Sequence, residues 1–158
     1  MATGPTYEAI ATVSPTSGTD YTFSNIPSTY TDLVLIGSCK MSGSTTLRLR
    51  LNGATSNYTY QIMRSDGTFT GSSSTSSIEL CDNDGSYLST FVTNIMNYSA
   101  ATLPNKVVVG QGGDQTDSTL VAGSLNSSSS ISSVTVLTTN SASFTSESML
   151  TLYGIARA

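Results

Sequence analysis

An uninterrupted apolar stretch lies early in the chain, within the segment Asn25–Cys39. The segment opens with a turn, because Pro27 fixes its own φ and Asn25 and Ser28 can hydrogen-bond nearby backbone. Leu33–Ile36 then follow without a polar residue. Such a run predicts a strand that is covered on both faces and lies at the centre of a sheet. We expect the rest of the fold to be built outward from this strand.

Shorter segments elsewhere alternate apolar and polar residues, which is typical of strands buried on one face. The clearest is Leu47–Leu51, where three leucines are expected to face inward and the two arginines between them outward. Asn52-Gly53 follows at once and suits a tight turn with positive φ. Tyr58–Ile62 then alternates again. We therefore predict a hairpin over Thr45–Met63, with a turn longer than two residues.

Turn residues separate the other predicted strands. The segment Arg64–Ser77 is rich in Ser, Thr and Gly and is predicted to be a loop. Tyr87–Tyr98 has helix-like apolar spacing, but its β-branched residues and its neighbours favour a strand. Val107–Val109 predicts another strand covered on both faces. The remaining predicted strands are Tyr7–Val13, 21–23, Ile78–Cys81, Thr119–Leu125, Ile131–Leu137 and Ser148–Ala156.

About ten strands with no convincing helix and no internal repeat indicate an all-β protein. The expected fold is an antiparallel β-sandwich, jelly-roll-like, in which residues 6–158 form a single domain. Residues 1–5 are small and are predicted to form a flexible N-terminal arm.

Composition narrows the possible functions. Charged residues are only 10% of the 158, while Ser and Thr make up about a third. Disorder is not expected, because hydrophobic residues are 37% and the net charge is only −4. The six Lys and Arg form no run, which argues against binding to nucleic acid or to a membrane surface. No secretory signal or membrane-spanning run is recognised, so we expect a soluble protein made in the cytoplasm.

Two cysteines, Cys39 and Cys81, each end an apolar run. Buried free thiols are the expected state for a protein made in a reducing compartment, and a disulfide between them is the alternative.

The residue types that support catalysis are scarce. Histidine is absent, which removes the usual general base and the commonest metal ligand. Asp82–Gly85 resembles half of a calcium loop but lacks the later bidentate Glu, so a turn with local side-chain hydrogen bonds is favoured. Asp114 and Asp117 are expected to lie in a solvated loop. No catalytic, cofactor-binding or metal-binding residue is predicted, and the chain is not expected to be an enzyme.

Three further features raise alternatives. Glycoside hydrolysis would need two facing carboxylates, and nothing pairs the glutamates Glu8, Glu79 and Glu147. Tyrosine rings could stack on sugars, but tyrosines on strands are expected to be half-buried with the hydroxyl at the rim. These strand tyrosines are Tyr7, Tyr58, Tyr60 and Tyr153. The sequons at Asn57 and Asn97 are interpreted as chance matches without a signal peptide.

Five segments together resemble a family of small virion proteins of tailed bacteriophages, many of which infect cyanobacteria or marine bacteria. These segments are Tyr7–Ala11, Ile26–Leu35, Leu49–Gly53, Asn57-Tyr58 and Leu152–Ile155. They span nearly the whole chain, and their motifs are structural rather than catalytic. The sequence departs from these relatives in its low aromatic content and its Ser-rich loops.

The resemblance implies a β-sandwich subunit of the particle, most specifically a capsid decoration (cement) protein that sits on the outer capsid surface as a homotrimer. The implied partner is the major capsid protein, and the implied location is the virion. A tail-fibre, head-fibre or neck subunit and a glycan-binding receptor-recognition module stay open as alternatives. The arm formed by residues 1–5 is a candidate to extend along a neighbouring subunit.

Overall fold

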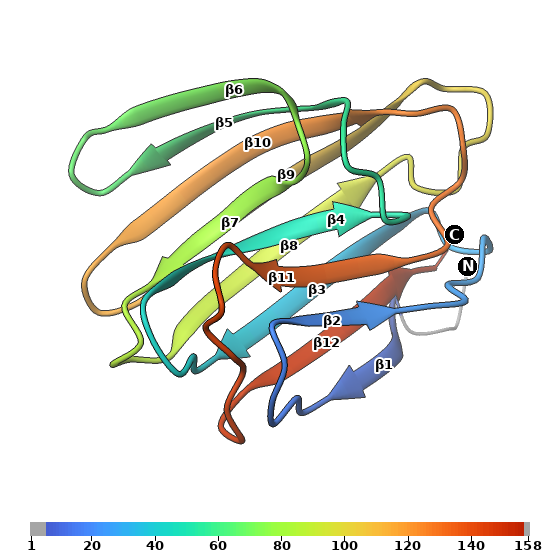
Figure 1. The fold of residues 1–158 in the computed structure, drawn as a ribbon. Helices are drawn as coiled ribbons and strands as arrows, with labels where there is room; N and C mark the ends of the chain where they lie inside the picture. The colour runs from blue at the N-terminus through green and yellow to red at the C-terminus, as the bar shows by residue number, and fades with distance from the viewer. Residues whose placement is uncertain (1–5, 157–158) are drawn as a thin grey trace.

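Two antiparallel β-sheets packed face to face form the described part of the chain, residues 6–156 of the computed structural model (Figure 1). These residues contain twelve strands and no helix, so the predicted all-β sandwich is confirmed. None of them forms a helix that is long and apolar enough to cross a membrane. The predicted arm, residues 1–5, lies outside the described residues.

The strands follow one another without any other regular element. The first six are β1 (Tyr7–Val13), β2 (Asp20–Phe23), β3 (Asp32–Cys39), β4 (Thr45–Leu51), β5 (Tyr58–Arg64) and β6 (Phe69–Thr75). The last six are β7 (Ile78–Asn83), β8 (Ser89–Met96), β9 (Asn105–Gly113), β10 (Ser118–Asn126), β11 (Val134–Thr138) and β12 (Met149–Ile155).

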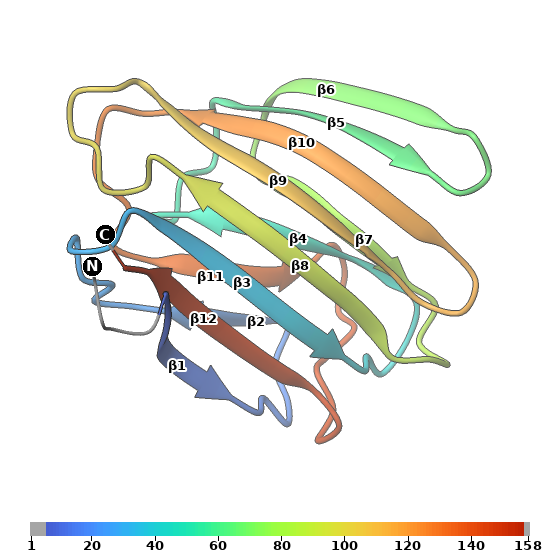
Figure 2. The same ribbon diagram turned by 180° about the vertical axis from the view of Figure 1, so that it is seen from behind.

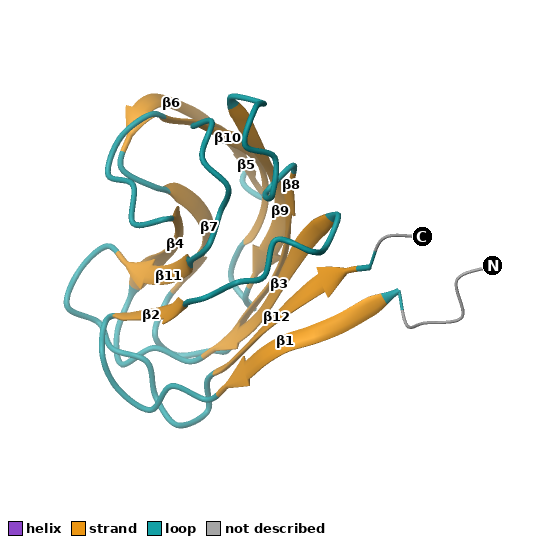
Figure 3. Ribbon diagram, turned by 90° about the vertical axis from the view of Figure 1, so that its right-hand side faces the viewer, coloured by secondary structure: helices purple, strands orange, loops and turns teal. Residues whose placement is uncertain are grey.

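The two sheets differ in size. The large sheet has eight strands in the order β1-β12-β3-β8-β9-β10-β5-β6, and the small sheet has four in the order β2-β11-β4-β7. Seen edge-on, the end of the large sheet that carries β5 and β6 curls toward the small sheet (Figure 3). The small sheet therefore packs against one face of the large sheet, and the other face of the large sheet is left without a second layer (Figure 2).

The hydrophobic core fills the space between the facing sheets. Leu33 and Leu35 on β3 meet the leucines of β4, and all of these side chains are fully buried. Glycines on the inner face make room for aromatic rings. A Cβ atom on Gly37 would stand 2.3 Å from the Phe91 ring, so the directly paired Phe91 lies across this glycine. The period-2 alternation predicted for Leu47–Leu51 is confirmed by this packing.

The central-strand prediction for Leu33–Ile36 is only partly right. Val34 on the outer face is buried, but Ile36 on the same face is 44% exposed. The strand is the third in the large sheet, between β12 and β8, rather than the middle one. The prediction that Val107–Val109 is covered on both faces is likewise wrong, because Val108 is buried and Val109 is 41% exposed. Both errors have one cause, which is that no layer covers the outer face.

The predicted hairpin over Thr45–Met63 does not form. Asn52 and Gly53 adopt the expected positive φ angles of 51° and 63°, and the Ala54 N–H donates to the Leu51 carbonyl at 3.0 Å. However, β4 pairs with β11 and β7, whereas β5 pairs with β10 and β6. The turn thus carries the chain from one sheet to the other, because both of the apolar faces it joins belong to the core and oppose each other.

Strand β6 occupies a segment that was predicted to be a loop. It pairs with β5 at the edge of the large sheet and is made of Phe, Gly, Ser and Thr residues that are mostly exposed. An edge strand with little buried surface has no apolar alternation, so its sequence looks like a loop. The strand interpretation of Tyr87–Tyr98, in contrast, is confirmed by β8.

Candidate interaction face

The feature that stands out for function is the uncovered outer face of the large sheet. The strand register places one outward residue from each of seven neighbouring strands on a single line across this face. We call this line the outer row; it consists of Thr151, Ile36, Val92, Gln111, Leu120, Met63 and Phe69.

Large apolar side chains dominate the outer row and its neighbours. Leu120 is 48% exposed and Phe69 is 74% exposed, and Val109 and Met149 extend the apolar surface on either side. Among the outward residues of β3, β8, β9, β10 and β5, Asp32 at the start of β3 is the one charged side chain. The described face thus combines a row of exposed apolar side chains with uncharged polar ones such as Gln61 and Asn94, and an exposed apolar row of this length is unusual for the surface of a monomer.

A shallow groove of about 790 Å³ runs along the outer row. Its floor combines the row's aliphatic side chains with small polar ones such as Ser38, Thr90 and Ser118. One end of the groove is closed by Asp114 and Asp117, which lie in the loop between β9 and β10. Uncharged polar groups among aliphatic side chains suit contact with protein surface better than contact with an ion.

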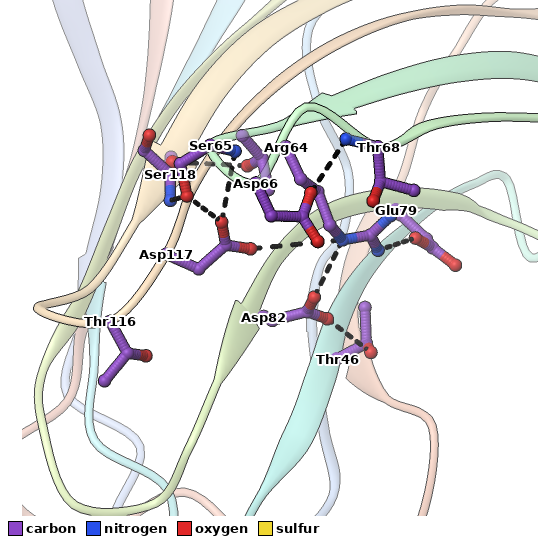
Figure 4. A network of polar contacts seen from close by, with 12 residues as sticks. Thr46, Arg64, Ser65, Asp66, Thr68, Glu79, Asp82, Thr116, Asp117 and Ser118 are labelled. Atoms are coloured by element: carbon purple, nitrogen blue, oxygen red, sulfur yellow. Dashed lines mark hydrogen bonds and ion pairs between the residues drawn. The ribbon is translucent and has the colours of Figure 1, made fainter.

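A network of charged side chains stands behind this end of the groove (Figure 4). The Arg64 Nη2 atom lies 2.8 Å from Glu79 Oε2, and Arg64 Nε lies 3.0 Å from Asp82 Oδ2 and 3.9 Å from Asp117 Oδ2. Burial alone would lower the pKa of Arg64, but the hydrogen bonds and charges of Asp82 and Glu79 outweigh it and raise the pKa. The guanidinium group is therefore a permanent structural cation.

Glu79 is the centre of the network. Besides Arg64, it accepts hydrogen bonds from Arg48 Nη2 at 2.7 Å and from the Tyr60 hydroxyl at 3.0 Å. Arg64 and Tyr60 come from β5 in the large sheet, whereas Glu79 lies on β7, the edge strand of the small sheet. The carboxylate thus clamps the curled end of the large sheet to the edge of the small one.

The three glutamates considered as hydrolytic residues are not brought together. Glu8 lies on β1, at the opposite edge of the large sheet from β5 and β6, and is hydrogen-bonded to Tyr30. Glu147 is exposed in the loop before β12. Glu79 is buried and is occupied by three donors. The structure does not place any two of them across a shared cleft.

Asp82–Gly85 forms a turn held by its own side chains. The Asp84 Oδ1 atom accepts hydrogen bonds from the N–H groups of Ser86 and Tyr87 at 2.7 and 3.1 Å. Asn83 Oδ1 accepts from the N–H of Gly85, which has a positive φ of 83°. This is the local side-chain bonding that the sequence favoured over a calcium loop.

Asp114 caps its own loop in the same manner. Its Oδ1 atom accepts hydrogen bonds from the N–H groups of Thr116 and Asp117, and its Oδ2 atom accepts from the N–H of Asp84 at 3.3 Å. Burial acts to raise the pKa of Asp114, but a hydrogen bond from the Thr116 hydroxyl at 2.6 Å and these backbone hydrogen bonds outweigh it and lower the pKa. Within residues 6–156, no group of three or more Cys, Asp or Glu side chains is arranged to hold a metal ion.

The four strand tyrosines considered for sugar stacking divide into a buried pair and a more exposed pair. Tyr58 and Tyr60 point inward and are 0% and 4% exposed, so the prediction that their hydroxyls lie at the rim is wrong. Tyr58 and Tyr60 lie on the same side of β5 as the buried Ile62, and this side faces the core. Tyr7 is 53% exposed and packs edge-on against Tyr153, with ring centroids 6.3 Å apart.

Both cysteines are free and buried, as expected from the sequence. Burial raises the pKa of the Cys39 thiol to about 12 and raises the pKa of Cys81 further. Neither thiol is therefore a reactive nucleophile at neutral pH. The sequon residues Asn57 and Asn97 act as turn residues, with positive φ angles of 68° and 59°.

Comparisons with protein-family models, curated proteins and solved structures found no match for this chain. Function therefore has to be inferred from the residues and their arrangement. The sequence did not single out the outer row, since period-2 alternation identifies a strand but leaves open which of its faces is covered.

Proposed function

We propose that this protein is a structural subunit of a virus particle, most specifically a capsid decoration (cement) protein of a tailed bacteriophage that binds the outer capsid surface as a homotrimer. The observation that carries the proposal is the uncovered, almost uncharged outer face of the large sheet. It offers a broad surface for contacts with other protein subunits. The resemblance of five sequence segments to small phage virion proteins supplies the biological setting.

The rest of the described structure fits a scaffold. Asp84 and Asp114 are engaged in turns and Glu79 in the clamp between the sheets, and both thiols are buried. A decoration protein gains its affinity from repeated weak contacts across a lattice, so it needs rigidity more than chemistry. The proposed partner is the major capsid protein and the proposed location is the virion, after synthesis in the host cytoplasm. The proposal includes no enzymatic activity, cofactor, nucleic acid or membrane.

Co-sedimentation with capsids tests this proposal. Purified protein is mixed with capsid shells that lack it, and bound protein is counted per capsid after separation. Saturation at a fixed number of trimers per capsid is the expected result. The absence of any co-sedimenting protein at saturating concentration would overturn the proposal.

One observation favours a second candidate, a glycan-binding module in a fibre or neck. Tyr7 exposes half of its surface beside Tyr153, and exposed tyrosine rings are suited to stacking on sugar faces. Glycan-array binding that disappears in Tyr7→Ala, with no binding to capsids, would replace the decoration proposal by this one.

A further inference from the structure

We infer that copies of this chain associate with one another through the outer face of the large sheet, with the outer row at the centre of the contact. The inference rests on the proposed function, because it names the surface that would build the proposed trimer. In a cyclic trimer, the copies can contact one another through this surface if all three turn their outer faces toward a shared threefold axis.

Charge distribution identifies a second copy as the occupant. Each chain has a net charge of −4, so two copies repel each other when their charged surfaces approach. The outward residues of the six interior strands β12, β3, β8, β9, β10 and β5 include one charged side chain, Asp32. That carboxylate accepts a hydrogen bond from the Asn97 N–H at the end of β8, away from the outer row. Close contact across the middle of the outer row therefore brings no like charges together, and the carboxylates of Asp114 and Asp117 lie at one end of the groove, where Asp117 is beside the Arg64 guanidinium.

The size of the face is adequate for a stable contact. Strands lie about 4.8 Å apart and outward residues on one strand about 6.7 Å apart, so eight strands with three or four outward residues each present roughly 900 Å². Standard specific interfaces bury about 800 Å² on each partner. The face therefore has the area of about one standard contact, and in a cyclic trimer each copy divides this area between its two neighbours.

The side chains favour a protein surface over a sugar. Ile36, Val92, Leu120 and Met63 are aliphatic, and they interdigitate well when one sheet packs on another. Sugar-binding grooves depend on flat aromatic rings. The one aromatic ring in the outer row, Phe69, stands at the far edge on β6, outside the groove, and Phe91, which borders the groove, is 4% exposed with its ring against Gly37.

Two matched leucine substitutions test the inference. Leu120→Glu puts a carboxylate in the middle of the outer row, where burial against a second copy would be prohibitive. Leu103→Glu is the control, because Leu103 is equally exposed, at 50% against 48%, but lies in the loop before β9 and off the outer face. Light scattering measures the solution mass of each variant, and circular dichroism melting verifies that each is folded.

The expected result is three times the 16.4 kDa chain mass for wild type and Leu103→Glu, and a single chain mass for folded Leu120→Glu. A wild-type trimer that persists in Leu120→Glu would overturn the inference while leaving the decoration proposal intact. A monomeric wild type would overturn it as well. Capsid co-sedimentation then separates the two proposals, since a monomer that binds capsids keeps the proposed function and a monomer that does not bind them loses it.

Discussion

The phenolic oxygen of Tyr58 is bonded to both backbone groups of Leu51. It accepts a hydrogen bond from the Leu51 N–H at 2.7 Å and donates one to the Leu51 carbonyl at 3.2 Å, and its ring is fully buried. Leu51 ends β4 in the small sheet and Tyr58 begins β5 in the large sheet. One side chain thus fixes the point at which the chain crosses between the sheets.

Tyr58→Phe is expected to destabilise the fold by about 1–3 kcal/mol, because it leaves the buried Leu51 N–H without its acceptor, while the Leu51 carbonyl keeps the hydrogen bond from the Ala54 N–H. Urea unfolding measures the change in the free energy of unfolding. Tyr7→Phe is the matched control, since Tyr7 is 53% exposed and should change stability by less than about 0.5 kcal/mol. Equal effects of the two substitutions would contradict the proposed role of Tyr58.

Glu79→Gln is expected to cost about 1–3 kcal/mol of stability, because Arg48 and Arg64 lose their shared carboxylate in a mostly buried setting. Urea unfolding measures the change in the free energy of unfolding. Glu147→Gln, at an exposed loop position, serves as the reference and should be near neutral. A loss for Glu79→Gln no larger than the loss for Glu147→Gln would contradict the role of Glu79 in joining the two sheets.

Local sequence patterns predicted most strands and turns of this fold. They did not predict which strands pair with one another. Strands such as β1 and β4 were predicted because alternation records burial on one face. Asn52-Gly53 was predicted as a turn because its positive φ angles are a local property. Which sheet the next strand joins is decided by pairing with β10, some sixty residues later, and no local pattern encodes that choice.

The candidate face was beyond prediction for the same reason. Its outer row joins Ile36 on β3 to residues as distant as Thr151 on β12, and only the register of six strand pairs puts them on one line. The runs Leu33–Ile36 and Val107–Val109 did carry a signal, because both place apolar residues on the outer side. That signal was interpreted as a strand covered on both faces. In the described structure the outer side of each strand is partly exposed, at Ile36 on β3 and at Val109 on β9.

Alkaline pH is expected to destabilise the protein through its buried thiols. Burial raises the pKa of Cys39 from 9.0 to about 12 and raises the pKa of Cys81 as well, so both stay protonated in the folded state after they would ionise in the unfolded chain. Stability is therefore full below about pH 9 and falls above it, by about 1.4 kcal/mol per pH unit for each thiol.

The double variant Cys39→Ala/Cys81→Ala isolates this effect. It should lose some stability at pH 7 through lost packing, yet show a shallower decline between pH 9 and 11 than wild type. The buried tyrosines Tyr58 and Tyr60 also have raised pKa values and act in the same direction, whereas Lys106, with a lowered pKa, acts in the opposite one. All three are unchanged in the variant, so identical slopes in the two proteins would exclude the thiols as the cause.

Gly37→Ala is expected to destabilise the core by about 1–3 kcal/mol through overpacking. The new Cβ would stand 2.3 Å from Phe91 Cζ and 2.9 Å from Leu150 Cδ2, and both of these side chains belong to the buried core. Because Gly37 and Phe91 are directly paired on β3 and β8, the cost should depend on the ring. In a Phe91→Leu background the added methyl group meets a shorter side chain, so the same substitution should cost less.

A double-mutant cycle measured by urea unfolding gives this coupling between Gly37→Ala and Phe91→Leu. Gly43→Ala, with no atom within 4 Å of its new Cβ, provides the reference. Additive effects of Gly37→Ala and Phe91→Leu would show that the glycine is required for some reason other than the ring that lies across it.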